Sequence, residues 1–484
     1  KKTFLKKLLI AISTIPLLIY GTIYACSFDD WSWSLDSNFT PETFVDKSYS
    51  PLFLSTDVFY GIGFDTEHST RFNNENIKDW STYLEGKINE KDLTFFLTDS
   101  SSMVVSNLDL YFKTAKPNKI SEKWGKQIKL DDSKTKDFFL FLNDAQTIEA
   151  YSTQRFDSWS YDETVKKEVL SDSEFIKSLE HKFNDTKDSF LKNRYWFLTI
   201  KAHFYSDQQA NAVTFFSRTE KTQPKNTLYY RALSYLAGIE YKQKHYAKSN
   251  YLYSIVFDKC PTLRVVSAYC FHPQQEKDWK QSLALAKTDD EKAALWAIQG
   301  YYNDEEKAIA EIYKLQPKNQ HIEYLLTRLI NNQENKIDRS FENKTVLENK
   351  KKTKDSINKS TINLVTKIAK SNKTNQPYLW NVAAGYLETL NGDFKQAEKN
   401  FVEAENKMPK TPLAISQVRL LRFVNNLSKI EQLSPENEKT ILADLSWLYY
   451  ELPKKPIENF RYENATSWSK NYLAALYRSQ KNTV

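Results

Sequence analysis

Residues 379–409 read LWNVAAGYLETLNGDFKQAEKNFVEAENKMP and predict two helices joined by a short turn at Gly392. In the second helix, Ala397 is small enough to let the two helices approach closely, and Phe401, one turn later, fills the space beside it. Pro409 closes the unit, because proline disfavours a helical conformation in the residue before it. The segment therefore predicts an antiparallel helix pair.

The spacing of small residue, aromatic residue and proline occurs twice more along the chain. The two further sets are Ala212, Phe216 and Pro224, and Ser249, Tyr253 and Pro261. Because a single helix pair cannot bury both of its faces, repeated units of this kind are expected to stack on one another. The pattern predicts an array of helix pairs that begins at about residue 186 and takes up over half of the chain.

Residues 378–409 and 230–261 resemble tetratricopeptide repeats. In the first segment, Gly385 stands where this family places a small residue in its first helix. The second segment carries Lys244 and His245 where the family has a turn glycine. The resemblance implies an all-α fold, a tetratricopeptide-like α-solenoid, whose concave surface binds proteins. The residues expected to pack the repeats are Ala212, Phe216, Ser249, Tyr253, Gly385, Ala397 and Phe401.

The chain is expected to contain five parts. These are a signal peptide at 1–25, an irregular, aromatic-rich and mainly helical N-terminal domain at 26–185, helical repeats at 186–330, a polar Lys/Asn-rich stretch at 331–377, and C-terminal helical repeats at 378–484. Only 9 of the 484 residues are glycine, which favours helices over architectures that need positive φ angles. The polar stretch is interpreted as a solvated insertion or linker, or as a long polar helix, between two halves of the array.

The first residues have the pattern of an export signal, in which four lysines precede an apolar run at 8–24. Residues 23–26, Ile-Tyr-Ala-Cys, resemble the lipobox of bacterial lipoproteins, and this resemblance implies cleavage before Cys26 and acylation of its thiol. The alternative is an uncleaved signal anchor, but the run contains Pro16 and is shorter than the roughly 20 residues of a spanning helix. We therefore expect an outer-membrane lipoprotein of the cell envelope.

The resemblances together favour a membrane-anchored lipoprotein that acts as a helical-repeat scaffold for protein partners in the bacterial cell envelope. The alternative is a SusD-like surface lipoprotein that binds glycan or peptide nutrients, because that family also combines a lipidated cysteine, early acidic residues and tetratricopeptide helices. The residues after Cys26, Ser-Phe-Asp-Asp, are similar to a surface-export signal or form a solvated tether. Periplasmic and surface-facing locations both stay open.

Charge and cysteine content narrow the choice of partners. The net charge of +7 includes four lysines of the signal segment and none of its acidic residues, which leaves about +3 for the mature chain. This balance lacks the strong basic footprint of nucleic-acid-binding proteins, so no nucleic-acid partner is expected. Cys260 and Cys270 either form a disulfide in an oxidising compartment or are two buried thiols on packed helices.

Catalytic motifs are missing from the sequence, which has no phosphate loop, HExxH helix, CxxC pair or nucleophile elbow. The densest polar cluster, Asp65, Glu67 and His68, is the one place for a hydrolase or metal site, but its histidine has no second histidine at helical spacing. We predict no enzyme, no catalytic residue, no metal and no cofactor. Early aromatic residues are interpreted as a groove for sugar rings or peptide, or as core packing; they are Trp31, Trp33, Tyr49, Phe53, Phe59 and Tyr60.

Overall fold

The computed structural model describes residues 37–39, 45–53, 68–152, 172–302, 304–338, 340–341, 344–458 and 460–480. Within these ranges every regular element is a helix, which confirms the all-α fold class. None of the helices in these ranges is long and apolar enough to cross a membrane.

The N-terminal part is a cluster of helices packed through aromatic side chains. Its elements are η2 (Lys47–Phe53), α2 (His68–Leu84), α3 (Glu90–Thr94), the π-helix η4 (Phe95–Asp99), α4 (Ser102–Thr114), α5 (Lys119–Trp124), α6 (Ser133–Ser152) and α7 (Ser173–Asp185). Trp80 of α2 lies at the centre, and its ring contacts those of Tyr83, Phe138, Phe141 and Phe190. Such aromatic pairs stabilise the packing beyond the area that they bury.

The rest of the chain forms successive helices that pack on their neighbours in sequence. The middle part contains α8 (Ser189–Phe204), α9 (Ala210–Thr219), η5 (Glu220–Thr222), α10 (Thr227–Lys242), α11 (Tyr246–Lys259), η6 (Pro261–Leu263), α12 (Arg264–Cys270), α13 (Glu276–Leu285), α14 (Asp289–Tyr302), α15 (Glu305–Leu315) and α16 (Ile322–Glu334). The last part contains α17 (Val346–Ser356), α18 (Lys359–Ser371), α19 (Pro377–Asn391), α20 (Phe394–Lys407), α21 (Pro412–Lys429), α22 (Pro435–Ser446), the π-helix η7 (Trp447–Glu451), α23 (Leu452–Lys454) and α24 (Glu463–Ser479).

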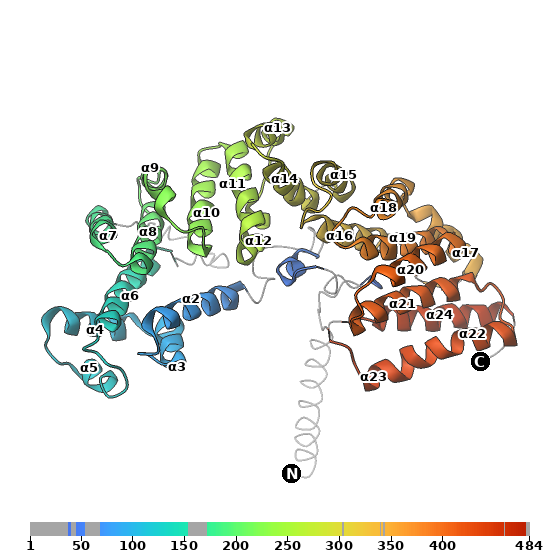
Figure 1. Cartoon of the computed structure of the whole chain (residues 1–484), viewed down its shortest axis with the longest axis horizontal. Coiled ribbons are helices and arrows are strands. Elements are labelled where there is room, and N and C mark those ends of the chain that lie inside the picture. Colours follow the sequence, from blue (N-terminus) through green and yellow to red (C-terminus); the bar gives the residue numbers. More distant parts are fainter. Residues whose placement is uncertain are drawn as a thin grey trace, which may run out of the picture.

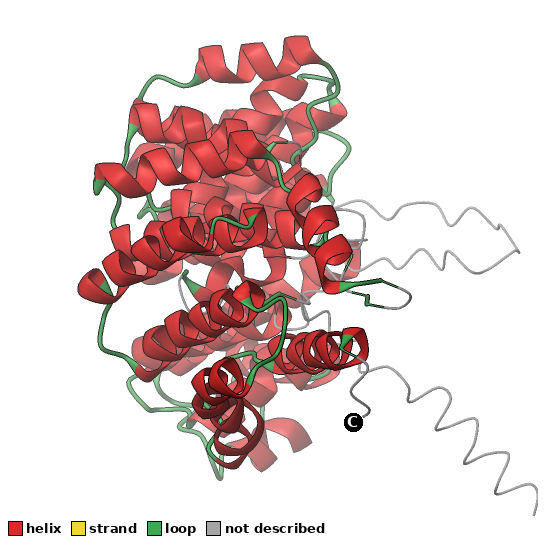
Figure 2. Cartoon of the chain, turned by 90° about the vertical axis from the view of Figure 1, so that its right-hand side faces the viewer, coloured by secondary structure: helices red, strands yellow, loops and turns green. Residues whose placement is uncertain are grey.

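These helices follow one another along an arch, and η2 lies on its inner side (Figure 1). The strongest contacts are between helices that are consecutive in sequence, such as α10 with α11, α14 with α15, and α19 with α20. Seen from its right-hand end, the arch shows many of its helices lying side by side in roughly parallel rows (Figure 2). The inner side of the arch is therefore built by residues that are distant in sequence.

Two clusters of buried apolar side chains form the interior of the arch. One cluster lies between residues 77 and 263, and the other combines residues 257–476 with the early residues Phe39, Tyr49, Leu52 and Phe53. Helix α11 belongs to both clusters, and the first contains side chains from both sides of the boundary expected at residue 185. The apolar interior therefore does not divide at that boundary.

Residues 331–377 contain helices that pack on the array, which differs from the solvated insertion of the sequence interpretation. Helix α18 buries Ile362, Val365 and Ile368 and packs against α19. Helix α17 is polar and begins with a capping box between Thr345 and Glu348. Composition underestimates burial here because the few apolar residues of α18 lie on one face of the helix.

The residues expected to pack the repeats are all buried, namely Ala212, Phe216, Ser249, Tyr253, Gly385, Ala397 and Phe401. The closest approach is between α19 and α20, where a Cβ atom added at Gly385 would lie 2.7 Å from the ring of Phe401. Any larger residue would require the Phe401 ring to move, so Gly385 permits the close approach of the two helices.

Candidate functional site

The inner side of the arch holds an early segment of the chain in a largely buried position. We call residues 37–39 and 45–53 together the strap. Its helix η2 packs against α12 and α16 (Figure 1). The residues of the array that hold the strap come from α11, α12, α16, α19, α21 and α24, and we call this set of contacts the strap site.

Tyr49 is the central side chain of the strap and is only 2% exposed. Its ring stacks on Tyr324, with the ring centroids 4.6 Å apart. Its hydroxyl lies 2.7 Å from Nδ1 of His321, and Nε2 of His321 lies 3.0 Å from Oδ1 of Asp258. The three polar groups form one buried chain of hydrogen bonds from the strap to the end of α11.

The protonation states of this chain follow from burial. Burial lowers the pKa of His321, although the hydrogen bond to Asp258 opposes this effect. Burial also raises the pKa of Tyr49, which keeps its hydroxyl protonated. For Asp258, burial acts to raise the pKa, but the hydrogen bonds from His321 and Lys259 outweigh it and hold the pKa below its usual range. A neutral His321 then donates from Nε2 to Asp258 and accepts from Tyr49 at Nδ1.

Two buried arginines hold the strap on either side of Tyr49. The Arg264 guanidinium lies 4.1 Å from the centre of the Tyr49 ring, donates to Ser48 and lies 3.5 Å from the Asp46 carboxylate. Arg328 donates from Nη1 to the main-chain carbonyl of Leu52 over 2.6 Å. Arginine suits this role because its planar group donates in several directions at once. Arg328 also forms an ion pair with Glu305 at 3.0 Å, which balances its buried charge.

The other end of the strap is held by Glu334 of α16. Its carboxylate accepts from the Ser37 hydroxyl at 2.6 Å, the Asn38 main-chain N–H at 2.9 Å and the Tyr386 hydroxyl at 2.8 Å. Gln417 of α21 donates to the main-chain carbonyl of Asn38 over 2.8 Å. The array therefore reads both the N–H and the C=O of the strap backbone, as it would for any extended polypeptide.

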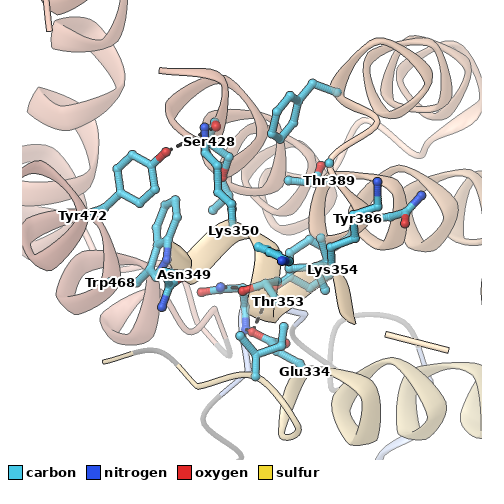
Figure 3. Close-up of a pocket in the computed structure, with 18 of the residues that line it drawn as sticks. Glu334, Asn349, Lys350, Thr353, Lys354, Tyr386, Thr389, Ser428, Trp468 and Tyr472 are labelled. Carbon is cyan, nitrogen blue, oxygen red and sulfur yellow. Dashed lines mark hydrogen bonds between the residues drawn. The ribbon is translucent and has the colours of Figure 1, made fainter. Parts of the chain in front are cut away.

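A pocket of about 320 Å³ adjoins this end of the strap, and we call it the α17 pocket (Figure 3). Asn38 and Glu334 lie at its base. Its apolar walls come from the aromatic residues Tyr386, Phe394, Trp468 and Tyr472, and its lysines Lys350, Lys351 and Lys354 all come from α17. The pocket thus combines aromatic faces with positive charge.

Several residues singled out in the sequence lie outside the described residues. These are Cys26, Trp31, Trp33, Phe59, Tyr60, Asp65 and Glu67. His68 is the first residue of α2. Tyr49 and Phe53 are buried in the apolar interior at 2% and 3% exposure, so at these two positions the structure shows core packing under the strap rather than an open groove.

The structure describes Cys260 and Cys270 as free thiols, not as a disulfide. Their surroundings differ. Cys260 ends α11 in the first apolar cluster beside Thr227, whereas Cys270 ends α12 beside the hydroxyl of Tyr253. Burial raises the pKa of Cys260 to about 11 and also raises that of Cys270, so both thiols are protonated and poorly reactive at neutral pH.

The residues that hold the strap were not singled out from the sequence. A usable signal exists for Arg328 and Glu334, because both lie in the apolar helical run IEYLLTRLINNQE of α16. A charged residue inside such a run is rarely buried without a partner. The sequence does not indicate that the partner of Glu334 is Asn38, nearly three hundred positions earlier.

No family model, curated protein or solved structure matches the chain. Within the described ranges, no group of three or more His, Cys, Asp or Glu side chains is placed to hold a metal ion. The strap site and the α17 pocket are therefore the observations that bear on function.

Proposed function

We propose that this chain is a tetratricopeptide-like helical-repeat scaffold of the bacterial cell envelope, anchored by a lipid on Cys26, that holds extended segments of partner proteins on the inner side of its arch. The consecutive packing of α10 with α11 and of α19 with α20 supports the solenoid assignment. The buried small and aromatic residues at repeat spacing support it as well.

The observation that carries the proposal is the strap site. Here the array binds an extended piece of its own chain through main-chain contacts, from Gln417 to Asn38 and from Arg328 to Leu52. Main-chain contacts do not depend on the sequence of the bound segment, whereas the stack of Tyr49 on Tyr324 selects an aromatic side chain. A partner segment with an aromatic residue can therefore make the same contacts in place of the strap.

The lipid anchor is tested by replacing its thiol. Cys26→Ala is expected to give an unprocessed or soluble protein, while the unchanged chain fractionates with membranes and carries the added mass of its acyl chains. The measurement is membrane fractionation together with intact-mass spectrometry. Equal fractionation of both proteins, with no lipid mass on either, would contradict the anchor.

Partner binding is tested by cross-linking in intact cells, purification of the cross-linked species, and reconstitution of the binary complex from purified proteins. If the partner uses the strap site, Tyr49→Ala should raise its affinity, because this change removes the stack and the hydrogen bond that hold the strap in place. The control is Tyr450→Ala, at a side chain that is 65% exposed, which should leave the affinity unchanged.

Two outcomes would overturn the scaffold. The first is the absence of any binary complex with a purified envelope protein. The second is a glycan and peptide screen in which the mature chain binds nutrients directly, which would favour the SusD-like alternative.

A further inference from the structure

The α17 pocket is separate from the contacts that hold the strap, and its volume of about 320 Å³ lies in the range of small-molecule sites. The pocket lies between α17 on one side and α21 and α24 on the other (Figure 3). Its lining exposes more apolar than polar surface. A site of this kind holds a ligand with an apolar body and a small number of polar groups.

The apolar body is defined by the aromatic walls. The ring of Trp468 is partly exposed and packs on that of Tyr472, with the centroids 5.1 Å apart. Phe394, also partly exposed, lies on the same pocket. Flat aromatic faces give a large contact area to a ring on a ligand at little entropic cost.

The polar groups are defined by the charges that remain available. Glu334 is at the base, but its oxygens already accept from Ser37, Asn38 and Tyr386. Lys350 lies 3.3 Å from Glu431, which neutralises it. The charges left to face a ligand are those of Lys351 and Lys354, whose side chains are exposed at the pocket.

We propose that the α17 pocket binds a ring-bearing carboxylate, with the ring against Trp468 and the carboxylate at Lys351 and Lys354. Such a group occurs in aromatic acids and in the uronic acid residues of glycans. The proposal goes beyond the scaffold function and depends neither on the lipid anchor nor on a protein partner.

The test uses two matched pairs of probes with the purified mature chain. The pairs are 3-phenylpropionate with 3-phenylpropanamide, and glucuronate with glucose, so each pair differs in its negative charge. Ligand-observed saturation-transfer NMR followed by titration is expected to show at least one carboxylate bound about tenfold more tightly than its neutral partner, because hydrogen bonds to charged groups are the stronger ones. The carboxylate that binds more tightly identifies the source of the ligand.

Variants on α17 locate the binding. Lys354→Gln should weaken carboxylate binding by about tenfold and Lys354→Arg should restore it, since Arg keeps the charge. The matched control is Lys352→Gln, which removes an exposed lysine from the same helix that does not line the pocket. Trp468→Leu should weaken both members of a pair equally.

Three results would each overturn the proposal. They are equal binding of charged and neutral probes, equal weakening by Lys352→Gln and Lys354→Gln, and no saturation transfer from any of the four probes at millimolar concentration.

Discussion

The helix pairs α10–α11 and α19–α20 share one register but use different residues at the turn. In the first pair the N–H of His245 bonds to the carbonyl of Glu240 over 2.8 Å, and in the second the N–H of Asp393 bonds to that of Glu388 over 2.9 Å. The residue before each donor has a positive φ angle, 63° at Lys244 and 83° at Gly392. The same backbone turn is thus made with and without glycine.

The two pairs also differ in how closely their helices approach. A Cβ atom added at Gly385 of α19 would lie 2.7 Å from the Phe401 ring, whereas one added at Gly238 of α10 would lie 3.5 Å from Phe204 and 3.6 Å from the Tyr253 hydroxyl. The first distance is a clash and the other two are ordinary contacts. Glycine is therefore required in α19, where a fully buried aromatic ring crosses the helix, and is only permitted in α10.

The largest expected effect tests this difference directly. Gly385→Val should lower the free energy of unfolding by about 3 kcal/mol, because the buried Phe401 ring has no space into which to move. The measurement is urea unfolding followed by circular dichroism. The same change in the first pair, Gly238→Val, is the control and should alter the stability by less than about 1 kcal/mol. Equal losses in the two variants would show that the close approach is not specific to α19 and α20.

The starts of the two pairs differ as well. Asn226 caps α10 with its own side chain, which accepts from the N–H of Tyr229 over 3.1 Å, whereas the N-cap residue of α19, Gln376, makes no side-chain cap hydrogen bond. Instead, Glu323 of α16 lies beside the start of α19 and is only 3% exposed. Burial raises the pKa of Glu323 to about 7, although the backbone amides of Gln376 and Asn375 offset part of the rise.

This carboxyl should make the stability depend on pH. Because the folded-state pKa lies above the unfolded value of 4.5, the stabilisation is complete below pH 4.5 and is lost as the pH rises through about 7. Between pH 5 and pH 8 the unfolding free energy should fall by about 2 kcal/mol through this group. Glu323→Gln cannot ionise and should remove that part of the pH dependence, as measured by urea unfolding at both pH values. Identical pH profiles for the two proteins would refute the assignment.

Local pattern explains how much of the fold could be predicted. Small and aromatic residues four positions apart lie on one helix face, so the spacing of Ala397 and Phe401 was enough to predict a helix pair with both side chains buried. Burial in α18 was missed because the Lys and Asn content of its segment concealed a single apolar face. The pattern was present at Ile362, Val365 and Ile368, but the composition received more weight.

The candidate site could not be predicted, because its contacts join positions that are distant in sequence. Tyr49 meets His321, and Asn38 meets Glu334, only when the strap lies along the inner side of the arch. No periodicity relates such positions, and the buried charges of Arg328 and Glu334 indicate only that some partner exists. The aromatic content of the early segment was noticed, but its role as the occupant of the site depends on the arch.

The smallest expected effect concerns the turn residues, and it tests whether the two turns are equivalent. A non-glycine residue at positive φ is strained by roughly 1 to 2 kcal/mol, and glycine recovers part of this while it adds freedom to the unfolded chain. Lys244→Gly should therefore raise the unfolding free energy by about 0.5 to 1 kcal/mol, and Gly392→Lys should lower it by a similar amount. Nothing lies within 4 Å of a Cβ atom added at Gly392, so backbone strain is the main term that changes there. Since the two turns share no contacts, the double variant should unfold at nearly the urea midpoint of the unchanged chain. If both single variants shifted the midpoint in the same direction, the two turns would not be equivalent, and side-chain contacts of Lys244 would have to account for its place in the first pair.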